Sequence, residues 1–264
     1  MPEPAAGAAL IELCSVSKAF ATADEAVLAL RDVSFDIGKG EFVSILGPSG
    51  CGKTTLMMIM VGLTAADAGE TRIGGQRISS PFSDSGIVFQ RPELLEWRTA
   101  LDNVLLQIEV RRLPVRNFVE RARALLAQVG LGGFESKLPF ELSGGMQQRV
   151  ALCRALVHDP EILLMDEPFG ALDALTRDQM NLDLQRIWLE KRKTAVLVTH
   201  SIEEAVFLSD RIAVMTPRPG TIAEIISIGL PRPRTLDGKD SPQFNAYTGH
   251  IRKRFVELGV LKDG

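Results

Sequence analysis

The sequence predicts an α/β fold with a mainly helical segment inserted into it, on three observations. Strand-like and helix-like segments alternate near both ends of the chain. A glycine-rich turn joins one of these strands to one of these helices, and the middle of the chain is patterned as helix alone. The 264 residues are enough for one large α/β domain or two small ones.

The N-terminal part is predicted to form strands. Residues 10–46 contain LIELCSV and EFVSILG, both rich in Val, Ile, Leu or Phe, and the turn-like IGKGE lies between them. EFVSILG is followed by a glycine-rich turn and by the helix-like KTTLMMIMVGL, the order that begins a nucleotide-binding βα unit. GETRIGG and SGIVFQ are predicted as two more short strands.

The middle of the chain is predicted to be helical between residues 99 and 132, with a break at Pro114. Alternation then resumes with EILLMDEP, a helix around LTRDQMNLDLQRIWLEK, AVLVTH, IEEAVFLSD and RIAVMT. ILLM and AVLV are apolar without alternation, which is typical of parallel strands covered on both faces. PRPRTLDGKDSP reads as a linker, and a last amphipathic segment predicts a short helix.

The composition and net charge argue against several classes of protein. Hydrophobic residues make up 45% of the chain and charged residues 24%, and the net charge is −3. This charge argues against a nucleic-acid partner, which a basic surface would bind. Three scattered cysteines fit a reducing compartment. We expect no signal peptide and no membrane span, because the longest apolar stretch, residues 56–63, is far shorter than the ~20 residues that cross a bilayer.

A phosphate-binding loop is the strongest local signal. GPSGCGKTT matches G-x-x-x-x-G-K-[ST] between a predicted strand and a predicted helix. The glycines allow successive N–H groups to point at phosphate oxygens, Lys53 adds charge for the β- and γ-phosphates, and the Thr54 hydroxyl suits Mg²⁺. The candidate nucleotide-binding residues of the loop are Gly47, Pro48, Ser49, Gly50, Cys51, Gly52, Lys53, Thr54 and Thr55.

Two carboxylates end the apolar strand ILLMDEP. Burying unpaired charge is costly, so Asp166 at the strand end is a candidate Mg²⁺ ligand. Glu167 is the candidate base that polarises the attacking water. A solvated Asp-Glu turn after a core strand is the alternative interpretation of this motif alone.

LSGGMQQR supplies a second helix start suited to phosphate. Ser143, Gly144 and Gly145 are predicted to begin a helix, where a hydroxyl and bare N–H groups attract anions. An ordinary helix cap is the simpler interpretation of this motif alone. Because the chain already has one phosphate-binding helix start, we expect the second to serve a neighbouring subunit.

In this order the motifs resemble the nucleotide-binding subunit of an ABC transporter over about residues 10–225. GALD at 170–173 and VLVTH ending at His200 also match the family. The resemblance implies a P-loop NTPase (ABC ATPase) core over 10–230, with an N-terminal antiparallel β subdomain and an inserted helical subdomain at about 92–158. A linker and helical extension would occupy 231–264.

The resemblance also implies roles for single residues. Gln90 would sense Mg²⁺ and the permease, and Phe20 would stack on adenine, in place of the commoner tyrosine. His200 would contact the γ-phosphate, so that Glu167, His200 and Lys53 form the catalytic set and Thr54, Gln90 and Asp166 the metal set. Met146 replaces the usual glutamine of the signature.

The implied assembly is a head-to-tail homodimer that binds two ATP molecules with Mg²⁺. Each nucleotide would lie between Lys53 of one copy and Ser143 of the other, and Asp173 would cross the interface. The finer pattern resembles importers of nitrate, sulfonates, taurine and related anions. Such an ATPase works at the cytoplasmic face of the inner membrane, with a permease and an extracytoplasmic solute-binding protein.

Four alternatives are weighed against this interpretation. A chromosome-maintenance ATPase would carry long heptad coiled coils, whereas about ninety residues without sustained heptads separate Lys53 from Ser143. A translation factor of the superfamily would carry two cassettes. A non-hydrolysing sensor is disfavoured because Glu167 and His200 are present. An export system, or an importer of another substrate, stays open, and the sequence does not name the substrate.

Two hypotheses concern single segments. Cys51 lies at a helix start near Lys53, both of which lower a thiol pKa, so we expect maleimides to inactivate the protein and ATP to protect it. A small residue that the loop merely tolerates is the alternative. Residues 86–106 are expected to dock the permease, because Leu94, Leu95 and Trp97 form an apolar cluster there. Core packing of Trp97 is the alternative.

Overall fold

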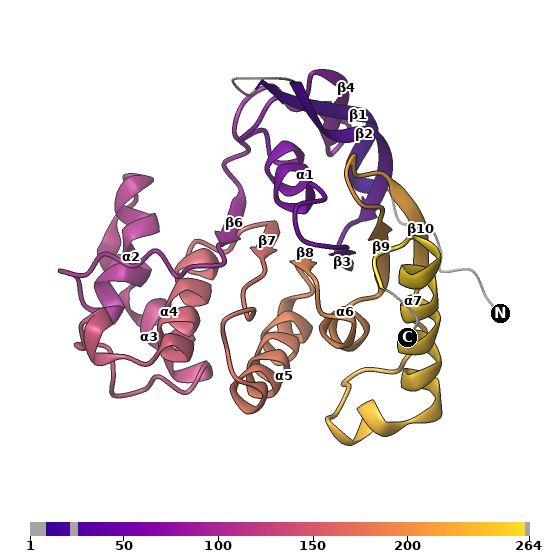
Figure 1. Cartoon of the computed structure of the whole chain (residues 1–264). Coiled ribbons are helices and arrows are strands. Elements are labelled where there is room, and N and C mark those ends of the chain that lie inside the picture. Colours follow the sequence, from indigo (N-terminus) through magenta and orange to yellow (C-terminus); the bar gives the residue numbers. More distant parts are fainter. Residues whose placement is uncertain (1–8, 22–25, 262–264) are drawn as a thin grey trace. The chain divides into compact units, whose positions relative to one another are not determined.

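The computed structural model describes residues 9–21 and 26–261, which fall into two compact units. The first unit combines residues up to Ser83 with those from Arg192 onward, and the second is Asp84–Lys191. Figure 1 labels most of the helices and strands of both. Within the described residues, no helix has both the length and the apolar character needed to cross a membrane.

The first unit contains an antiparallel sheet in the strand order β2-β1-β4-β5. Its strands are β1 (Ala9–Ala21), β2 (Ala26–Gly38), β4 (Ala68–Ile73) and β5 (Gln76–Arg77). Ile11 pairs with Ile37 on one side and with Ile73 on the other, and all three side chains are buried. Apolar side chains at matched positions therefore hold the register of this sheet. The predicted antiparallel N-terminal β subdomain is confirmed.

The same unit contains a second sheet, in which β3 (Phe42–Leu46) lies parallel to and between β8 (Thr194–Thr199) and β9 (Arg211–Met215). Every residue of β3 and β8 is buried. This confirms the prediction that AVLV is a parallel strand covered on both faces. β10 (Ile222–Ser227) extends this sheet antiparallel to β9 and was not predicted as a strand.

Three α-helices complete the first unit. Their bounds are α1 (Lys53–Met60), α6 (Ile202–Leu208) and α7 (Pro242–Glu257). α1 follows β3 through the glycine-rich loop, so the predicted strand, turn and helix occur in that order. Ser201 begins α6 and Ser241 begins α7, and each hydroxyl accepts from a backbone N–H of the first turn. These serines fix where the two helices start.

The segment before α7, interpreted from sequence as a linker, is attached to α6 by Arg232, which donates to the Leu208 carbonyl oxygen at 2.5 Å, and by Arg234. Arg234 is 7% exposed and donates to the carbonyl oxygens of Val206 (2.8 Å), Phe207 (3.0 Å) and Ser209 (2.8 Å). Those carbonyls lie at the C-terminal end of α6, where helices leave acceptors unpaired. Burial lowers the pKa of Arg234 to about 10, a value that still leaves the guanidinium charged at neutral pH.

The second unit is mainly helical. Its elements are β6 (Ser85–Val88), α2 (Ala100–Val110), α3 (Val119–Gln128), α4 (Gly144–Leu156), β7 (Ile162–Asp166) and α5 (Ala174–Lys191), with short 3₁₀ turns at Val115–Asn117 and Pro139–Glu141. β6 pairs parallel with β7, and every β7 residue is buried. The unit includes the residues 92–158 assigned from sequence to a helical subdomain, together with these two strands and α5.

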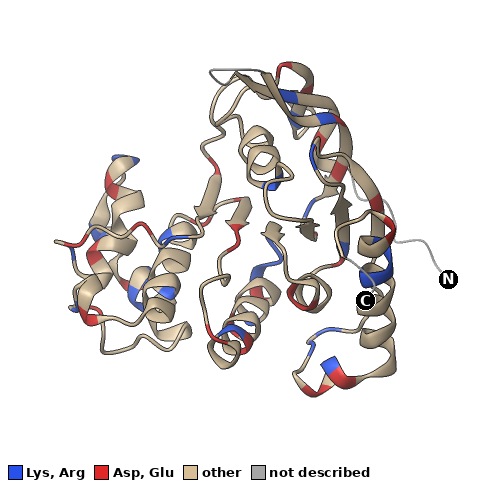
Figure 2. Ribbon diagram, viewed as in Figure 1, with Lys and Arg blue, Asp and Glu red and all other residues tan. Residues whose placement is uncertain are grey.

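Charge is spread over both units. Figure 2 shows Lys and Arg interspersed with Asp and Glu along the ribbons. Many of these groups are paired in the structure, for example Arg121 with Asp159 at 3.0 Å and Lys191 with Asp159 at 2.8 Å in the second unit. Two cations therefore share the single carboxylate of Asp159.

Candidate functional site

The phosphate-binding loop of the first unit joins β3 to α1. Gly52, the residue before α1, has φ 103°, a conformation that side chains other than glycine rarely adopt. A Cβ there would lie 2.8 Å from Leu30 Cδ2 and 3.0 Å from the Ala29 carbonyl oxygen, so the loop runs directly over β2. A side chain at this position would push the loop off its support.

Lys53 is the first residue of α1 and is 5% exposed. Its Nζ donates to the carbonyl oxygens of Gly47 (3.0 Å) and Pro48 (2.9 Å), so the ammonium group lies inside the curl of the loop. Thr54 is exposed and Thr55 is half-buried. The first two residues of α1 therefore supply a positive charge and a hydroxyl at a helix N-terminus, an arrangement suited to phosphate.

The Cys51 hypothesis is wrong in its premise. The thiol is 1% exposed, and burial raises its pKa. The neighbouring Lys53 and backbone N–H groups act in the lowering direction, but burial is the largest influence. Local charge and helix position, which are visible in the sequence, favour a lowered pKa, but desolvation is visible only in the structure and dominates here.

Asp166 and Glu167 lie at the end of β7 in the second unit. Asp166 is 9% exposed, and Glu167 is half-buried with φ 44°. A non-glycine residue at positive φ is uncommon, and such residues often occur at functional sites. The Glu167 carbonyl accepts from Gly170 N–H at 3.1 Å, a turn that holds this unusual backbone in place.

Ser143 begins α4, as the sequence predicts. Its hydroxyl accepts from the N–H of Met146 at 3.3 Å, and both Ser143 and Gly144 are exposed, whereas Gly145 is buried. The first N–H groups of α4 and the Ser143 hydroxyl are therefore located where an anion can approach.

Asp173 begins α5. Its two carboxylate oxygens accept from Thr176, one from the backbone N–H at 3.0 Å and one from the side-chain hydroxyl at 2.6 Å. The hydroxyl bond, followed by the backbone bond, lowers the pKa of Asp173. The side chain that the family resemblance assigns to an interface is thus also a helix cap.

His200 is exposed between two fixed neighbours. The Thr199 hydroxyl donates to Glu204 at 2.7 Å and accepts from the N–H of Ser201 at 3.0 Å. Thr199 and Glu204 are buried, so β8 and α6 are connected directly beneath His200. This pair was not predicted, although Thr199 and Glu204 both stand in the segment VTHSIEE around His200.

Phe20 and Gln90 are also accessible. Phe20 is 44% exposed near the end of β1, with Lys18 Nζ 5.4 Å from its ring centroid, so one aromatic face is available for stacking. Gln90 is exposed two residues after β6. The preceding carbonyl, that of Phe89, accepts from the buried Gln148 of α4 at 3.1 Å.

The candidate residues divide between the two units. The phosphate loop, Phe20 and His200 belong to the first, whereas Gln90, Ser143, Asp166, Glu167 and Asp173 belong to the second. Their convergence on one nucleotide stays a prediction.

The comparisons with known proteins agree on one family. The model of the ABC transporter family matches residues 30–170. The aliphatic sulfonates import ATP-binding protein of Bacillus cereus is 40% identical over 252 residues, covering 96% of this chain and 98% of its own length. The taurine import ATP-binding protein of Roseobacter denitrificans is 50% identical over 196 residues, covering 74% and 73%.

An uncharacterised ABC transporter ATP-binding protein of Methanocaldococcus jannaschii is 45% identical over 249 residues, covering 94% of this chain and 90% of its own length. Among solved structures, a dimeric bacterial ABC transporter cassette superposes with a TM-score of 0.74 at 34% identity, covering 83% of this chain and 98% of that one. The same cassette is also known in a post-hydrolysis state with ADP and phosphate, with a TM-score of 0.73 at 33% identity and the same coverage.

Proposed function

Because the chain belongs to the ABC transporter family of ATP-binding proteins, we propose that it powers import of a small sulfonate through a separate permease. The chain is an ATPase of this family and binds ATP. Two of the relatives described above are named as import ATP-binding proteins for aliphatic sulfonates and for taurine, which supports a sulfonate as the substrate. Export, or import of another substrate, is the alternative.

The phosphate loop carries the nucleotide-binding part of this proposal. Backbone N–H groups at the start of α1 bind the phosphates, and Lys53 exchanges its contacts with the Gly47 and Pro48 carbonyls for phosphate oxygens. The exposed ring of Phe20 offers a stacking surface for adenine. The loop's backbone geometry is the single observation on which this part depends most.

The donor atoms also suit Mg²⁺. The Thr54 hydroxyl, the Asp166 carboxylate and the Gln90 amide oxygen are the hard ligands that this ion prefers, and Asp166 is a buried carboxylate at a strand end. When bound, the ion neutralises charge that develops on the phosphoryl oxygens.

Hydrolysis is assigned to Glu167 and His200. The Glu167 carboxylate accepts a proton from the attacking water, and the turn that closes at Gly170 holds this residue in its unusual backbone conformation. His200 donates to the γ-phosphate from the end of β8.

We assign the second phosphate-binding helix start to a partner copy. Ser143, Gly144 and Gly145 at the start of α4 would bind the nucleotide held by the other subunit's phosphate loop. The dimeric state of the similar cassette supports this arrangement. The working assembly is then a homodimer at the cytoplasmic face of the inner membrane, with permease subunits and an extracytoplasmic binding protein.

Reconstitution tests the transport part. Proteoliposomes that contain this ATPase and its candidate permease should hydrolyse ATP faster, and accumulate taurine, when the binding protein and taurine are added. Glu167→Gln is the matched inactive control. Stimulation by sulfate or nitrate alone would indicate another import substrate, and movement of taurine in the opposite direction would indicate export.

Mixing two inactive variants tests the shared site. Lys53→Ala and Ser143→Arg are each expected to be nearly inactive, but in a mixed dimer one site receives an intact loop and an intact Ser143. Partial recovery of ATPase activity on mixing supports the shared site. No recovery, with both variants folded and with no ATP-dependent dimerisation of the mixture, contradicts it.

A further inference from the structure

The turn between β9 and β10, residues 216–221, lies against the phosphate loop within the first unit. The turn is closed by Thr216, whose hydroxyl accepts from Thr221 N–H at 3.0 Å and donates to the Pro219 carbonyl at 3.1 Å. It is also attached to β2 by two backbone hydrogen bonds. The Gly220 N–H donates to the Ala29 carbonyl oxygen at 2.9 Å, and the Gly220 carbonyl accepts from the Arg31 backbone N–H at 3.0 Å. The turn is therefore a braced element and not a loose connection.

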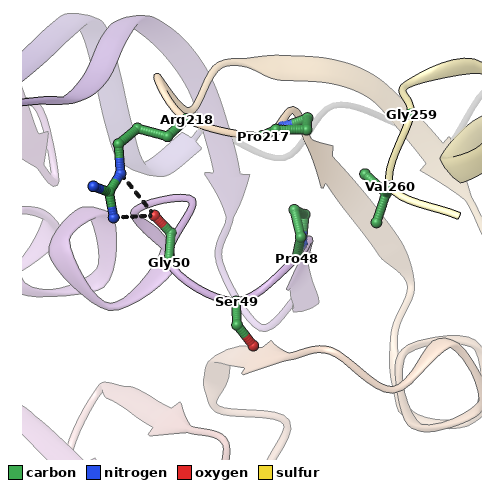
Figure 3. A pocket seen from close by; sticks show the side chains of 7 residues that line it. All are labelled: Pro48, Ser49, Gly50, Pro217, Arg218, Gly259 and Val260. Atoms are coloured by element: carbon green, nitrogen blue, oxygen red, sulfur yellow. Dashed lines mark hydrogen bonds between the residues drawn. The ribbon is translucent and has the colours of Figure 1, made fainter.

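Arg218 in this turn binds a carbonyl of the phosphate loop. Its Nε and Nη2 both donate to the Gly50 carbonyl oxygen, at 3.2 and 3.0 Å. Figure 3 shows the guanidinium reaching across to Gly50, with Ser49 and Pro48 beside it. Gly50 has φ 75° and is the third residue of a turn closed by Cys51 N–H and the Pro48 carbonyl at 3.4 Å.

Gly220 covers the next carbonyl of the same loop. A Cβ at this position would lie 2.1 Å from the Cys51 carbonyl oxygen, so only a glycine lets the two backbones approach this closely. Two successive carbonyls of the phosphate loop, those of Gly50 and Cys51, thus face the β9–β10 turn.

These contacts fix the direction in which the loop's N–H groups point. In a trans peptide the carbonyl and the following N–H point to opposite sides. Holding the Gly50 and Cys51 carbonyls on the side of the β9–β10 turn therefore turns the Cys51 N–H toward the Pro48 carbonyl, to which it donates, and turns the Gly52 N–H away from the β9–β10 turn. Phosphate binding at a glycine-rich loop depends on that orientation.

A pocket lies beside this part of the loop. With a volume of about 480 Å³, it separates Pro48 and Ser49 from Pro217 and from Val260, which follows α7. Arg218 lines this pocket, and its two hydrogen bonds are the side-chain contacts that the structure gives the Gly50 carbonyl, whereas Lys53 binds the Gly47 and Pro48 carbonyls.

We propose that Arg218 is a positioning residue for nucleotide binding, which keeps the phosphate loop in its phosphate-binding conformation by binding the Gly50 carbonyl. It acts on the loop and not on a phosphate. Loss of Arg218 therefore weakens every nucleotide whose β-phosphate uses the loop, ATP and ADP alike. The proposal rests on ATP binding at this loop.

The test compares Arg218→Ala, Arg218→Lys and the wild type by equilibrium binding of ATP and ADP and by ATPase kinetics. Arg218→Ala should weaken both nucleotides about tenfold, the equivalent of one charge-assisted hydrogen bond. KM should rise equally while kcat stays within about twofold. Arg218→Lys keeps a charged donor and should recover at least half of the lost affinity.

Arg252→Ala is the matched control, because Arg252 is an exposed arginine of the same unit at 58% exposure and contacts Glu203 at 3.8 Å. It should bind both nucleotides as the wild type does. Unchanged affinities in Arg218→Ala overturn the proposal, as does loss of thermal stability without loss of affinity. Weaker binding of ATP alone also overturns it, since that indicates direct contact with the γ-phosphate. If the wild type binds no ATP, the proposed function itself fails.

Discussion

Acidification is expected to destabilise the second unit through His158, a half-buried residue just after α4. Its Nε2 lies 3.0 Å from Arg111 Nη2 and 3.2 Å from the Ser85 carbonyl oxygen. Burial, followed by the charges of Arg111 and Arg121, lowers the pKa of His158 to about 4, whereas Asp84 and the Ser85 carbonyl act in the opposite direction. The folded protein therefore keeps this imidazole neutral.

The sign follows from proton binding in the two states. The unfolded chain protonates His158 near the ordinary value of 6.5, whereas the folded chain does so only near 4. Between these values the unfolded state binds more protons, so the free energy of unfolding falls as the pH falls. The difference of about 2.5 between the pKa values sets an upper limit of about 3 kcal/mol on the free energy of unfolding that is lost. Because the ring is only partly buried, we expect about 1–2 kcal/mol.

Urea unfolding followed by tryptophan fluorescence measures the loss of stability in the second unit, which contains His158. Both tryptophans belong to the second unit, and Trp188 on α5 is 3% exposed, so its emission changes when that unit unfolds. Between about pH 7 and about pH 4.5, the wild type should lose about 1–2 kcal/mol more than His158→Gln, which stays neutral and accepts from Arg111. Equal losses in the two proteins would refute the assignment, because other groups would then carry the acid sensitivity.

Three further predictions concern the candidate site and its surroundings. Glu167→Gln should bind Mg-ATP and hydrolyse it about 10²–10⁴-fold more slowly, with the trapped dimer visible by light scattering; near-normal turnover would remove Glu167 from the mechanism. Maleimide should label the exposed Cys14 first and the buried Cys51 only after unfolding, as peptide mass spectrometry will show; fast, ATP-protected labelling of Cys51 would restore the original hypothesis. Leu94→Asp and Trp97→Ala should lower transport in proteoliposomes and spare basal ATPase activity, since Trp97 is 75% exposed and Leu94 is half-buried; loss of folding or of basal activity in both would contradict docking.

Much of the fold was predictable because it depends on local patterns. ILLM and AVLV lack alternation since both faces of β7 and β8 are covered, and the structure buries every residue of both strands. The helix start at Ser143 was predictable from a hydroxyl followed by two glycines, and Ser143 does cap α4.

What the sequence did not reveal depends on contacts between distant segments. The hydrogen bonds from Arg218 to the Gly50 carbonyl join residues 168 positions apart, and no local sequence pattern around either residue predicts them. Arg234 stands in a Pro- and Arg-rich segment typical of linkers, yet it is buried against α6. The raised pKa of Cys51 likewise comes from packing around the loop, which local charge alone does not report.

The cap made by Ser143 leaves its one hydroxyl proton uncommitted. A serine hydroxyl carries two lone pairs and a single hydrogen, and the bond from Met146 N–H takes only a lone pair. The proton can therefore be given to an oxyanion while the helix stays capped. Asp173 differs, because an ionised carboxylate has no proton to give and both of its oxygens already accept from Thr176. Of the two capping residues, only Ser143 can donate a hydrogen bond to a phosphate oxygen while its side chain still caps its own helix.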